Sequence, residues 1–138
     1  MIIKQISVFV ENKLGRLAEI TEVMAKNNVD IHALSISDTT NFGILRAIVD
    51  QPEKAEIALK DAGFTVSITS VLSVAIDDTP GGLAGCLRLL ADRNIPVEYA
   101  YAFVSQTAKK ACVVLRIEKD FEALKVLEEA GYSSIDLQ

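Results

Sequence analysis

The feature that most constrains this chain is an internal repeat of a strand, a glycine turn and a helix. Sliding the sequence by 66 residues places ISVFVENKLGRL, which begins at Ile6, on LSVAIDDTPGGL, which begins at Leu72. Gly15 then falls on Gly81. Further along, a shift of 68 residues places LKDAGF on LEEAGY, so two residues have been added within one loop. Such a drift is what two copies of one fold would show.

Each copy follows the order β-α-β-β-α-β. In the first copy, alternating and helical spacing predicts strands at 6–10, 29–37, 43–50 and 64–71 and helices at 16–27 and 52–62. The last of these strands runs into the second copy. There, the same signals predict strands at 72–76, 97–104, 111–117 and 134–137 and helices at 83–93 and 121–130.

This order predicts the α+β class, with two tandem ferredoxin-like βαββαβ sandwiches built on antiparallel sheets, one in residues 1–70 and one in residues 71–138. The first and third strands of each sheet are expected in its middle. Phe9, Leu34 and Ile36 stand at positions that we expect on the sheet face turned away from the helices. A partner sheet or a second subunit would cover such a face.

Composition narrows the range of partners. The net charge is −5 and lysine and arginine form no cluster, so a nucleic-acid partner is not expected. No apolar run is long enough to span a membrane. The first residues, MIIKQISVFVEN, alternate and lack a basic segment and a cleavage site, so they are interpreted as a strand and not as a signal peptide. A cytoplasmic location is the expectation.

The two cysteines also favour a cytoplasmic location. Cys86 and Cys112 lie inside apolar runs, which predicts buried free thiols in a reducing environment. The chain has no CxxC motif and no Cys/His ligand spacing, so neither a metal nor a cofactor is predicted.

The repeated glycine turn is the candidate binding site. A helix N-terminus carries unpaired N–H groups and partial positive charge, and glycine lets a ligand approach them. Asn12 stands beside the first turn and Asp78 beside the second. Each side chain could bond a ligand ammonium or cap its own helix. A carboxylate on the N–H groups and an ammonium on side-chain oxygens together describe a free amino acid, although a glycine turn before a helix is also common without a ligand.

The element order and the turn motif resemble the ACT domain family. The motif [D/N]-x-[P/L]-G-x-L opens the first helix of each copy, and NNVDI or RNIPV leads into the second strand. The whole chain resembles a tandem pair of ACT domains without an attached enzyme. The resemblance implies regulatory binding of a small molecule, usually an amino acid, at an interface between ACT units, which often join edge to edge through their second strands.

The resemblance also implies which residues would touch the ligand. In the first copy these are the loop residues Asn12, Leu14, Gly15, Arg16 and Leu17 and the strand residues Asp30 and Ile31. In the second copy they are Asp78, Pro80, Gly81, Gly82 and Leu83.

The two copies are not equally complete by this comparison. In serine-binding relatives the polar loop and strand positions are both asparagine, whereas here the strand position is Asp30. A carboxylate at this position still suits an ammonium. The corresponding position of the second copy is Pro96, which has no polar side chain, so the first copy is the more complete site.

Other functions remain open alternatives. A ferredoxin-like fold can host acylphosphatase chemistry, and Arg16 lies in the region that would bind phosphate, but ENKLGRL lacks a phosphate-cradle pattern. His32 has no nucleophile indicated beside it. Tyr99, Tyr101 and Phe103 share one strand face, as in single-strand-binding sheets, although the acidic balance opposes that role.

We therefore predict a non-catalytic regulatory protein that senses a free amino acid. A homodimer and a regulated protein partner are expected, without nucleic acid or membrane. A small acylphosphatase-like enzyme and a protein–protein interaction module without a ligand are the alternatives.

Overall fold

In the computed structural model, residues 1–38, 41–104 and 109–134 are described. Their contacts divide the chain into two compact units. The first unit consists of residues 4–69, and the second unit combines residues 1–3 with the described residues from Ser70 onward. The second unit therefore combines segments that are not contiguous in sequence.

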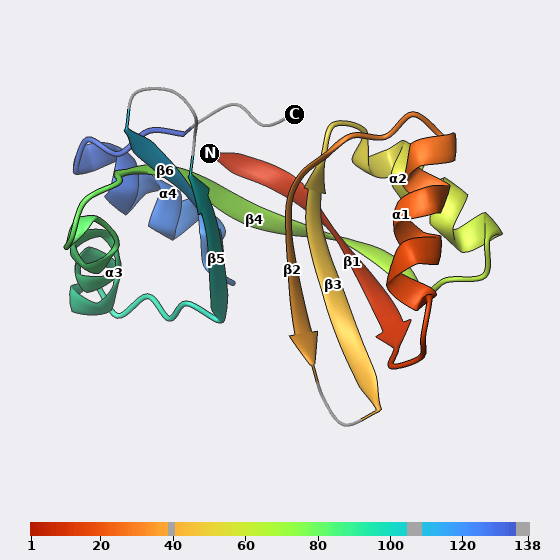
Figure 1. The fold of residues 1–138 in the computed structure, drawn as a ribbon. Coiled ribbons are helices and arrows are strands. Elements are labelled where there is room, and N and C mark those ends of the chain that lie inside the picture. Colours follow the sequence, from red (N-terminus) through yellow and green to blue (C-terminus); the bar gives the residue numbers. More distant parts are fainter. Residues whose placement is uncertain (39–40, 105–108, 135–138) are drawn as a thin grey trace. The chain divides into compact units, whose positions relative to one another are not determined.

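The first unit follows the predicted order of elements (Figure 1). Its strands and helices are β1 (Ile2–Glu11), α1 (Arg16–Lys26), β2 (Ile31–Asp38), β3 (Phe42–Val49), α2 (Pro52–Asp61) and the beginning of β4 (Val66–Asp77). The hydrogen-bonded strand order β2-β3-β1-β4 places the first and third strands in the middle, as predicted. The pairs β1–β3 and β2–β3 are antiparallel.

The second unit repeats this arrangement. It contains the rest of β4, followed by α3 (Gly82–Asp92), β5 (Tyr99–Val104), β6 (Lys110–Arg116) and α4 (Asp120–Glu129). Strand β6 lies between β4 and β5, and both pairs are antiparallel. Most of the predicted strand at 134–137 lies outside the described residues. Ser133, just before it, forms an antiparallel bridge with Ala75. The predicted α+β, ferredoxin-like class is confirmed.

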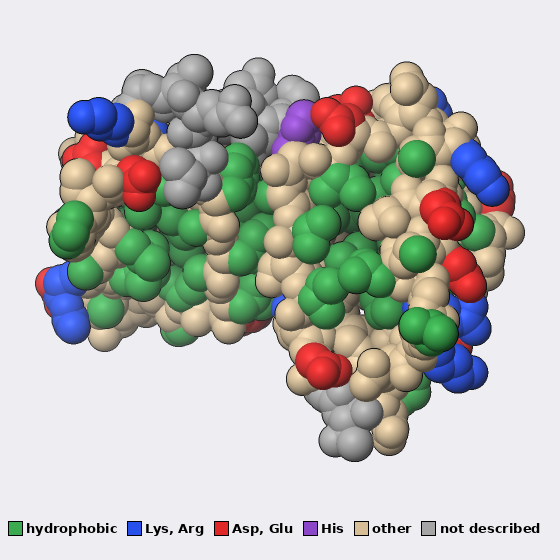
Figure 2. All heavy atoms as spheres, in the orientation of Figure 1, with side chains coloured by type: hydrophobic (Ala, Val, Ile, Leu, Met, Phe, Trp, Pro, Cys, Tyr) green, Lys and Arg blue, Asp and Glu red, His purple; other side chains and the backbone are tan. Residues whose placement is uncertain are grey.

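Each unit has its own apolar core, because two helices cover one face of the strands in each unit. In the first unit, Ile6, Val8 and Leu45 of the sheet pack with Ile20 and Met24 of α1. The second core contains the equivalent residues of β4, β6, α3 and α4, which include Leu72, Val74, Leu90, Leu115 and Leu127. Figure 2 shows apolar side chains at the surface of both units, with acidic and basic side chains interspersed around them.

The strand register corrects one expectation about sheet faces. Phe9 lies opposite Ile44, and Ile44 lies opposite Ser37. Leu34 and Ile36 instead lie opposite Ala47 and Leu45, which are buried under the helices. Since neighbouring residues of a strand point to opposite faces, Leu34 and Ile36 share the helix-covered face and Phe9 does not. Leu34 and Ile36 are nevertheless half exposed, because β2 is an edge strand of its unit.

The first three residues of the chain complete the second sheet. The Ser73 N–H donates to the Met1 carbonyl at 2.8 Å, and two residues along β4 the Ala75 N–H donates to the Ser133 carbonyl at 2.7 Å. Met1 and Ile2 also pack against the core of the second unit. One edge of β4 thus forms hydrogen bonds with Met1, near the start of the sequence, and with Ser133, near its end.

The cysteines are both buried and free, as predicted. Burial raises the pKa of the Cys86 thiol, and it raises the pKa of the Cys112 thiol despite a 3.1 Å contact with the Ser73 hydroxyl. Within the described residues, no helix is long and apolar enough to cross a membrane.

Candidate functional site

The loop between β1 and α1 presents an open helix N-terminus. Gly15 adopts a left-handed conformation with φ +86°, and α1 begins at the next residue. A Cβ at Gly15 would have no neighbour within 4 Å, so the approach to the loop is unobstructed. Within the described residues, no side chain caps α1, and Asn12 is therefore not the helix cap that we considered. Leu14 at the tip of this loop is fully exposed.

Charged side chains surround the same loop. The Arg16 guanidinium donates to the Glu19 carboxylate at 2.9 Å and lies 4.0 Å from a Glu11 carboxylate oxygen. The Lys13 ammonium lies 2.9 Å from the other Glu11 oxygen. The Lys13 hydrogen bond and charge, followed by the charge of Arg16, lower the pKa of Glu11. Arg16 is thus held by two carboxylates and is not arranged in a phosphate cradle.

Asp30 and Ile31, the strand residues predicted to bind the same ligand as the loop, lie at the end of the sheet opposite to the loop. Glu11 pairs with Phe42 at the start of β3, whereas Ile31 pairs with Val49 at its end. The seven steps of β3 between those partners span about 24 Å. Asp30 exchanges hydrogen bonds with Asp50 beyond that end, through its N–H to the side chain and its carbonyl from the Asp50 N–H. One unit therefore does not bring Asn12 and Asp30 together.

A cavity joins the loop to the free edge of β2. It has a volume of about 240 Å³ and is lined by Val10, Glu11, Asn12, Lys13, Leu17, Ile36, Asp38 and Gly43. Of the predicted loop residues, Asn12 and Leu17 contribute to it, while Leu14 projects away as a fully exposed side chain.

The second copy has the same turn with different surroundings. Gly81 adopts φ +89° before α3, which again lacks a side-chain cap within the described residues. A Cβ at Gly82 would lie 2.1 Å from the Asp77 carbonyl oxygen, so the second glycine is needed for close packing of the turn. Asp78, Pro80 and Leu83 are all exposed.

The strand position of the second copy differs from that of the first. Pro96 is exposed and lines an apolar cavity of about 500 Å³ beside α3, together with Leu87, Ala91, Asn94, Ile95 and Val97. This cavity offers one side-chain amide and no charged side chain, so it has no group that matches the Asp30 carboxylate.

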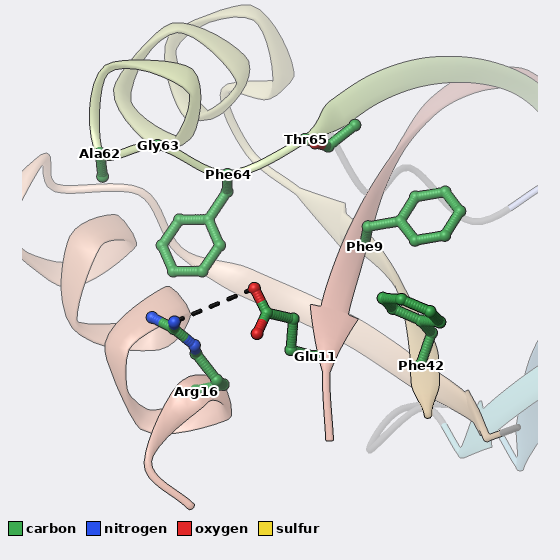
Figure 3. A pocket seen from close by; sticks show the side chains of 8 residues that line it. All are labelled: Phe9, Glu11, Arg16, Phe42, Ala62, Gly63, Phe64 and Thr65. Carbon is green, nitrogen blue, oxygen red and sulfur yellow. Dashed lines mark ion pairs between the residues drawn. The ribbon is translucent and has the colours of Figure 1, made fainter. Parts of the chain in front are cut away.

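The structure also contains a pocket that the sequence analysis did not single out. It has a volume of about 380 Å³ and lies in the first unit between the end of β1, the start of α1 and the α2–β4 connection (Figure 3). Its lining residues are Phe9, Glu11, Arg16, Phe42, Ala62, Gly63, Phe64 and Thr65. Comparison of the two repeats would have been the available signal, since Phe9 and Phe42 have no aromatic counterparts in the second copy.

The residues considered for catalysis or for single-strand binding lie at ordinary positions on the surface or in the sheet. The His32 Nδ1 lies 3.9 Å from an Asp30 carboxylate oxygen at the start of β2. Tyr99, Tyr101 and Phe103 of β5 are partly buried. Among the described residues, histidine, cysteine and acidic side chains do not form a group of three that could hold a metal ion.

Comparisons with known proteins agree with this fold. Residues 1–136 match a family model described as an ACT domain pair. The chain is similar to the crystal structure of protein BT0572 from Bacteroides thetaiotaomicron, with 42% sequence identity and a TM-score of 0.92 over 98% of this chain and 92% of that chain. The comparison with curated proteins returns no match.

Two more distant structures share the fold. They are the regulatory subunits of aspartate kinase from Thermus thermophilus, crystallised ligand free, and from Thermus flavus. The first is 15% identical with a TM-score of 0.67 and covers 95% of this chain and 97% of its own. The second is 16% identical with a TM-score of 0.66 and covers 94% and 95%. The repeat, the two βαββαβ units and the family match lead to one conclusion: the chain belongs to the ACT domain pair family.

Proposed function

We propose that this protein is a non-catalytic regulatory module that binds a free amino acid between ACT units of two copies of the chain. The main support is the N-terminus of α1, which has no side-chain cap within the described residues. It begins after a left-handed glycine, and the space around this glycine is open to a ligand. Backbone N–H groups and the helix dipole at such an end favour a carboxylate. Asn12 stands next to this position with an exposed side chain that does not cap the helix.

An edge-to-edge dimer would bring the separated site residues together. Strand β2 is an edge strand of its unit, and it runs in the same direction as β1 because both are antiparallel to β3. When two β2 strands pair antiparallel, the loop end of one sheet meets the opposite end of the other. Asn12 of one copy would then face Asp30 of the partner subunit. The amide and carboxylate oxygens would hold the ligand ammonium.

The size and lining of the loop cavity fit half of such a site. Its volume of about 240 Å³ is below the roughly 300–1,000 Å³ of complete ligand pockets, and it opens at the β2 edge. The fully exposed Leu14 and the half-exposed Ile36 would be covered by the partner. Leu17 would border the ligand side chain, which favours a small or medium amino acid.

Calorimetry against the twenty amino acids tests this proposal. We expect one of them to bind below the millimolar range, and Asn12→Ala or Asp30→Ala to weaken it by roughly tenfold to a hundredfold, because charge-assisted hydrogen bonds contribute about 1.5–3 kcal/mol. Gly15→Val should reduce binding further, since a branched side chain strains the left-handed turn and fills the approach. Unchanged binding in all three variants would place the site elsewhere.

A mixing experiment tests whether the site is shared between copies. In a dimer of one Asn12→Ala copy and one Asp30→Ala copy, one of the two shared sites keeps both native residues. Co-refolded mixtures should therefore recover about a quarter of the binding sites, because half the dimers are mixed and each has one intact site of two. A site contained in one copy would recover none. Light scattering of the unmixed protein should give the mass of a dimer.

The output of such a module would be a change in its contact with another protein. Residues 1–70 and 71–138 would act as its two repeats, with the first copy binding the ligand because Pro96 replaces the acidic strand position in the second. A cytoplasmic location fits the two reduced cysteines and is part of the proposal.

A further inference from the structure

The 380 Å³ pocket of the first unit arises where two neighbouring strands differ in length. The Phe9 N–H donates to the Thr65 carbonyl at 3.0 Å, just before β4 begins, but β1 continues to Glu11. A notch therefore opens beyond Thr65, under the turn at Gly63. Its volume lies within the roughly 300–1,000 Å³ range of pockets that hold small molecules.

Aromatic rings form the walls of this pocket. Figure 3 shows the Phe64 ring on the Arg16 side of Glu11, and the rings of Phe9 and Phe42 on the other side. Phe9 and Phe42 pack edge to face, with ring centroids 6.3 Å apart. Both are about half exposed, at 54% and 50%. Aromatic pairs gain from such offset or edge-to-face contacts.

Arg16 lines the pocket, and within the described residues its guanidinium makes one side-chain hydrogen bond. A guanidinium has five N–H donors. Arg16 gives a 2.9 Å hydrogen bond to Glu19, and its other terminal nitrogen is 4.0 Å from Glu11, beyond hydrogen-bond distance. The planar guanidinium suits a bidentate carboxylate. The two charged residues that line the pocket, Glu11 and Arg16, balance each other in formal charge.

The second unit has an equivalent backbone arrangement with different side chains. The Ala75 N–H donates to the Ser133 carbonyl, as Phe9 does to Thr65, and Gly131 has the left-handed conformation of Gly63. Asp77 pairs with Lys110 in the register of Glu11 with Phe42.

The side chains at these equivalent positions have different chemistry. Phe9, Arg16 and Phe42 correspond to Ala75, Gly82 and Lys110. Lys110 there forms an ion pair with Asp77. The backbone arrangement thus recurs, but among the described residues the first unit alone has two half-exposed phenylalanine rings and an arginine at these positions. A purely structural turn would not need that set of side chains.

We propose that this pocket is a second ligand site, which binds a small aromatic molecule that carries a carboxylate. The aromatic ring of the ligand packs on the Phe9–Phe42 pair, on the other side of Glu11 from Phe64, and its carboxylate accepts hydrogen bonds from Arg16. The site is complete within one unit. It is distinct from the proposed amino-acid site between copies, because Asp30, at the opposite end of the sheet, has no part in it, although Arg16 belongs to the predicted residues of both sites.

Titration with indole-3-propionate tests this site. The protein contains no tryptophan, so indole fluorescence reports the probe alone. We expect a saturable change in emission with wild-type protein. Phe42→Ala should lower the affinity by about tenfold, because base- or ring-stacking contacts of this kind contribute about 1–3 kcal/mol. Arg16→Gln should lower it by about tenfold or more, through loss of a charge-assisted hydrogen bond.

Two controls make the result specific. Phe121→Ala removes a ring that is 76% exposed on α4, outside the pocket, and should bind the probe as the wild type does. Indole-3-propionamide, which lacks the charge, should bind the wild type about tenfold more weakly than the acid, and should bind Arg16→Gln with the same affinity as the acid.

Three results would overturn the proposal. They are the absence of saturable binding at millimolar probe, wild-type affinity in Phe42→Ala and Arg16→Gln, or equal affinity of wild type for the acid and the amide. Circular dichroism would confirm that each variant is folded, which the exposure of Phe42 leads us to expect. Because the amino-acid proposal is tested by Asp30→Ala and subunit mixing, each proposal fails by its own measurement.

Discussion

At the scale of single residues, two glycines of α3 have opposite roles. A Cβ at Gly82 would lie 2.1 Å from the Asp77 carbonyl oxygen, whereas a Cβ at Gly85 would meet only the Tyr132 hydroxyl at 3.7 Å, an ordinary contact. We expect Gly82→Ala to lower the free energy of unfolding by about 1–3 kcal/mol, as overpacking does. Gly85→Ala should raise it by about 0.5–1 kcal/mol, because alanine loses less entropy in a helix. Urea denaturation measures both, and the same sign for the two substitutions would contradict this account.

At the scale of elements, β1 supports the second unit through its first residues. Ile2 packs against that unit's core, beside the Met1–Ser73 hydrogen bond. Because Ile2 is only partly buried, Ile2→Ala should cost about 1–2 kcal/mol, less than the 2–5 kcal/mol of a fully buried site. Hydrogen exchange should accelerate in β6 and α3 peptides more than in α1 peptides. Ile57→Ala, which changes a 61% exposed side chain of α2, serves as the control and should leave both patterns unchanged. If hydrogen exchange accelerates equally in both units, the first residues of β1 do not specifically stabilise the second core.

At the scale of the whole molecule, the two units differ in their response to alkaline pH, because both cysteines lie in the second unit. Burial raises the pKa of each thiol in the folded state, so above about pH 8.5 the unfolded chain loses protons that the folded chain keeps. Stability should therefore fall as pH rises, by up to about 1.4 kcal/mol per thiol per pH unit. Urea denaturation under reducing conditions between pH 7 and pH 10 measures this slope. A Cys86→Ala/Cys112→Ala variant should have a shallower slope over this range, and an unchanged slope would refute the assignment.

Much of the fold was predictable because its signals are local. Alternation and helical spacing depend on which residues neighbour one another along the chain, and they predicted the order of elements in both units. Asn28 and Asn94 adopt the left-handed conformation after α1 and α3, which asparagine tolerates at a helix end. Gly15 and Gly81 have left-handed φ angles for the same reason, since the turn must reverse the chain before each helix.

The candidate site was predictable only in part. Spacing located the turn, and the resemblance supplied Asn12 and Asp30, but nothing local placed them at opposite ends of a sheet. That separation follows from strand pairing, which joins residues far apart in sequence. The aromatic pocket was missed for a similar reason: Phe9, Phe42 and Phe64 come from three segments and show no common spacing.

The amino-acid order alone specifies the repeat, the class of fold and the two glycine turns, because backbone preference and apolar periodicity act over a few residues. The folded arrangement was needed to show that Leu34 and Ile36 face the helices and that Met1–Ile3 belong to the second unit. It alone decided that a notch opens beyond Thr65. These features depend on strand register and strand length, and a shift of one residue in register would turn every side chain of the strand to the other face.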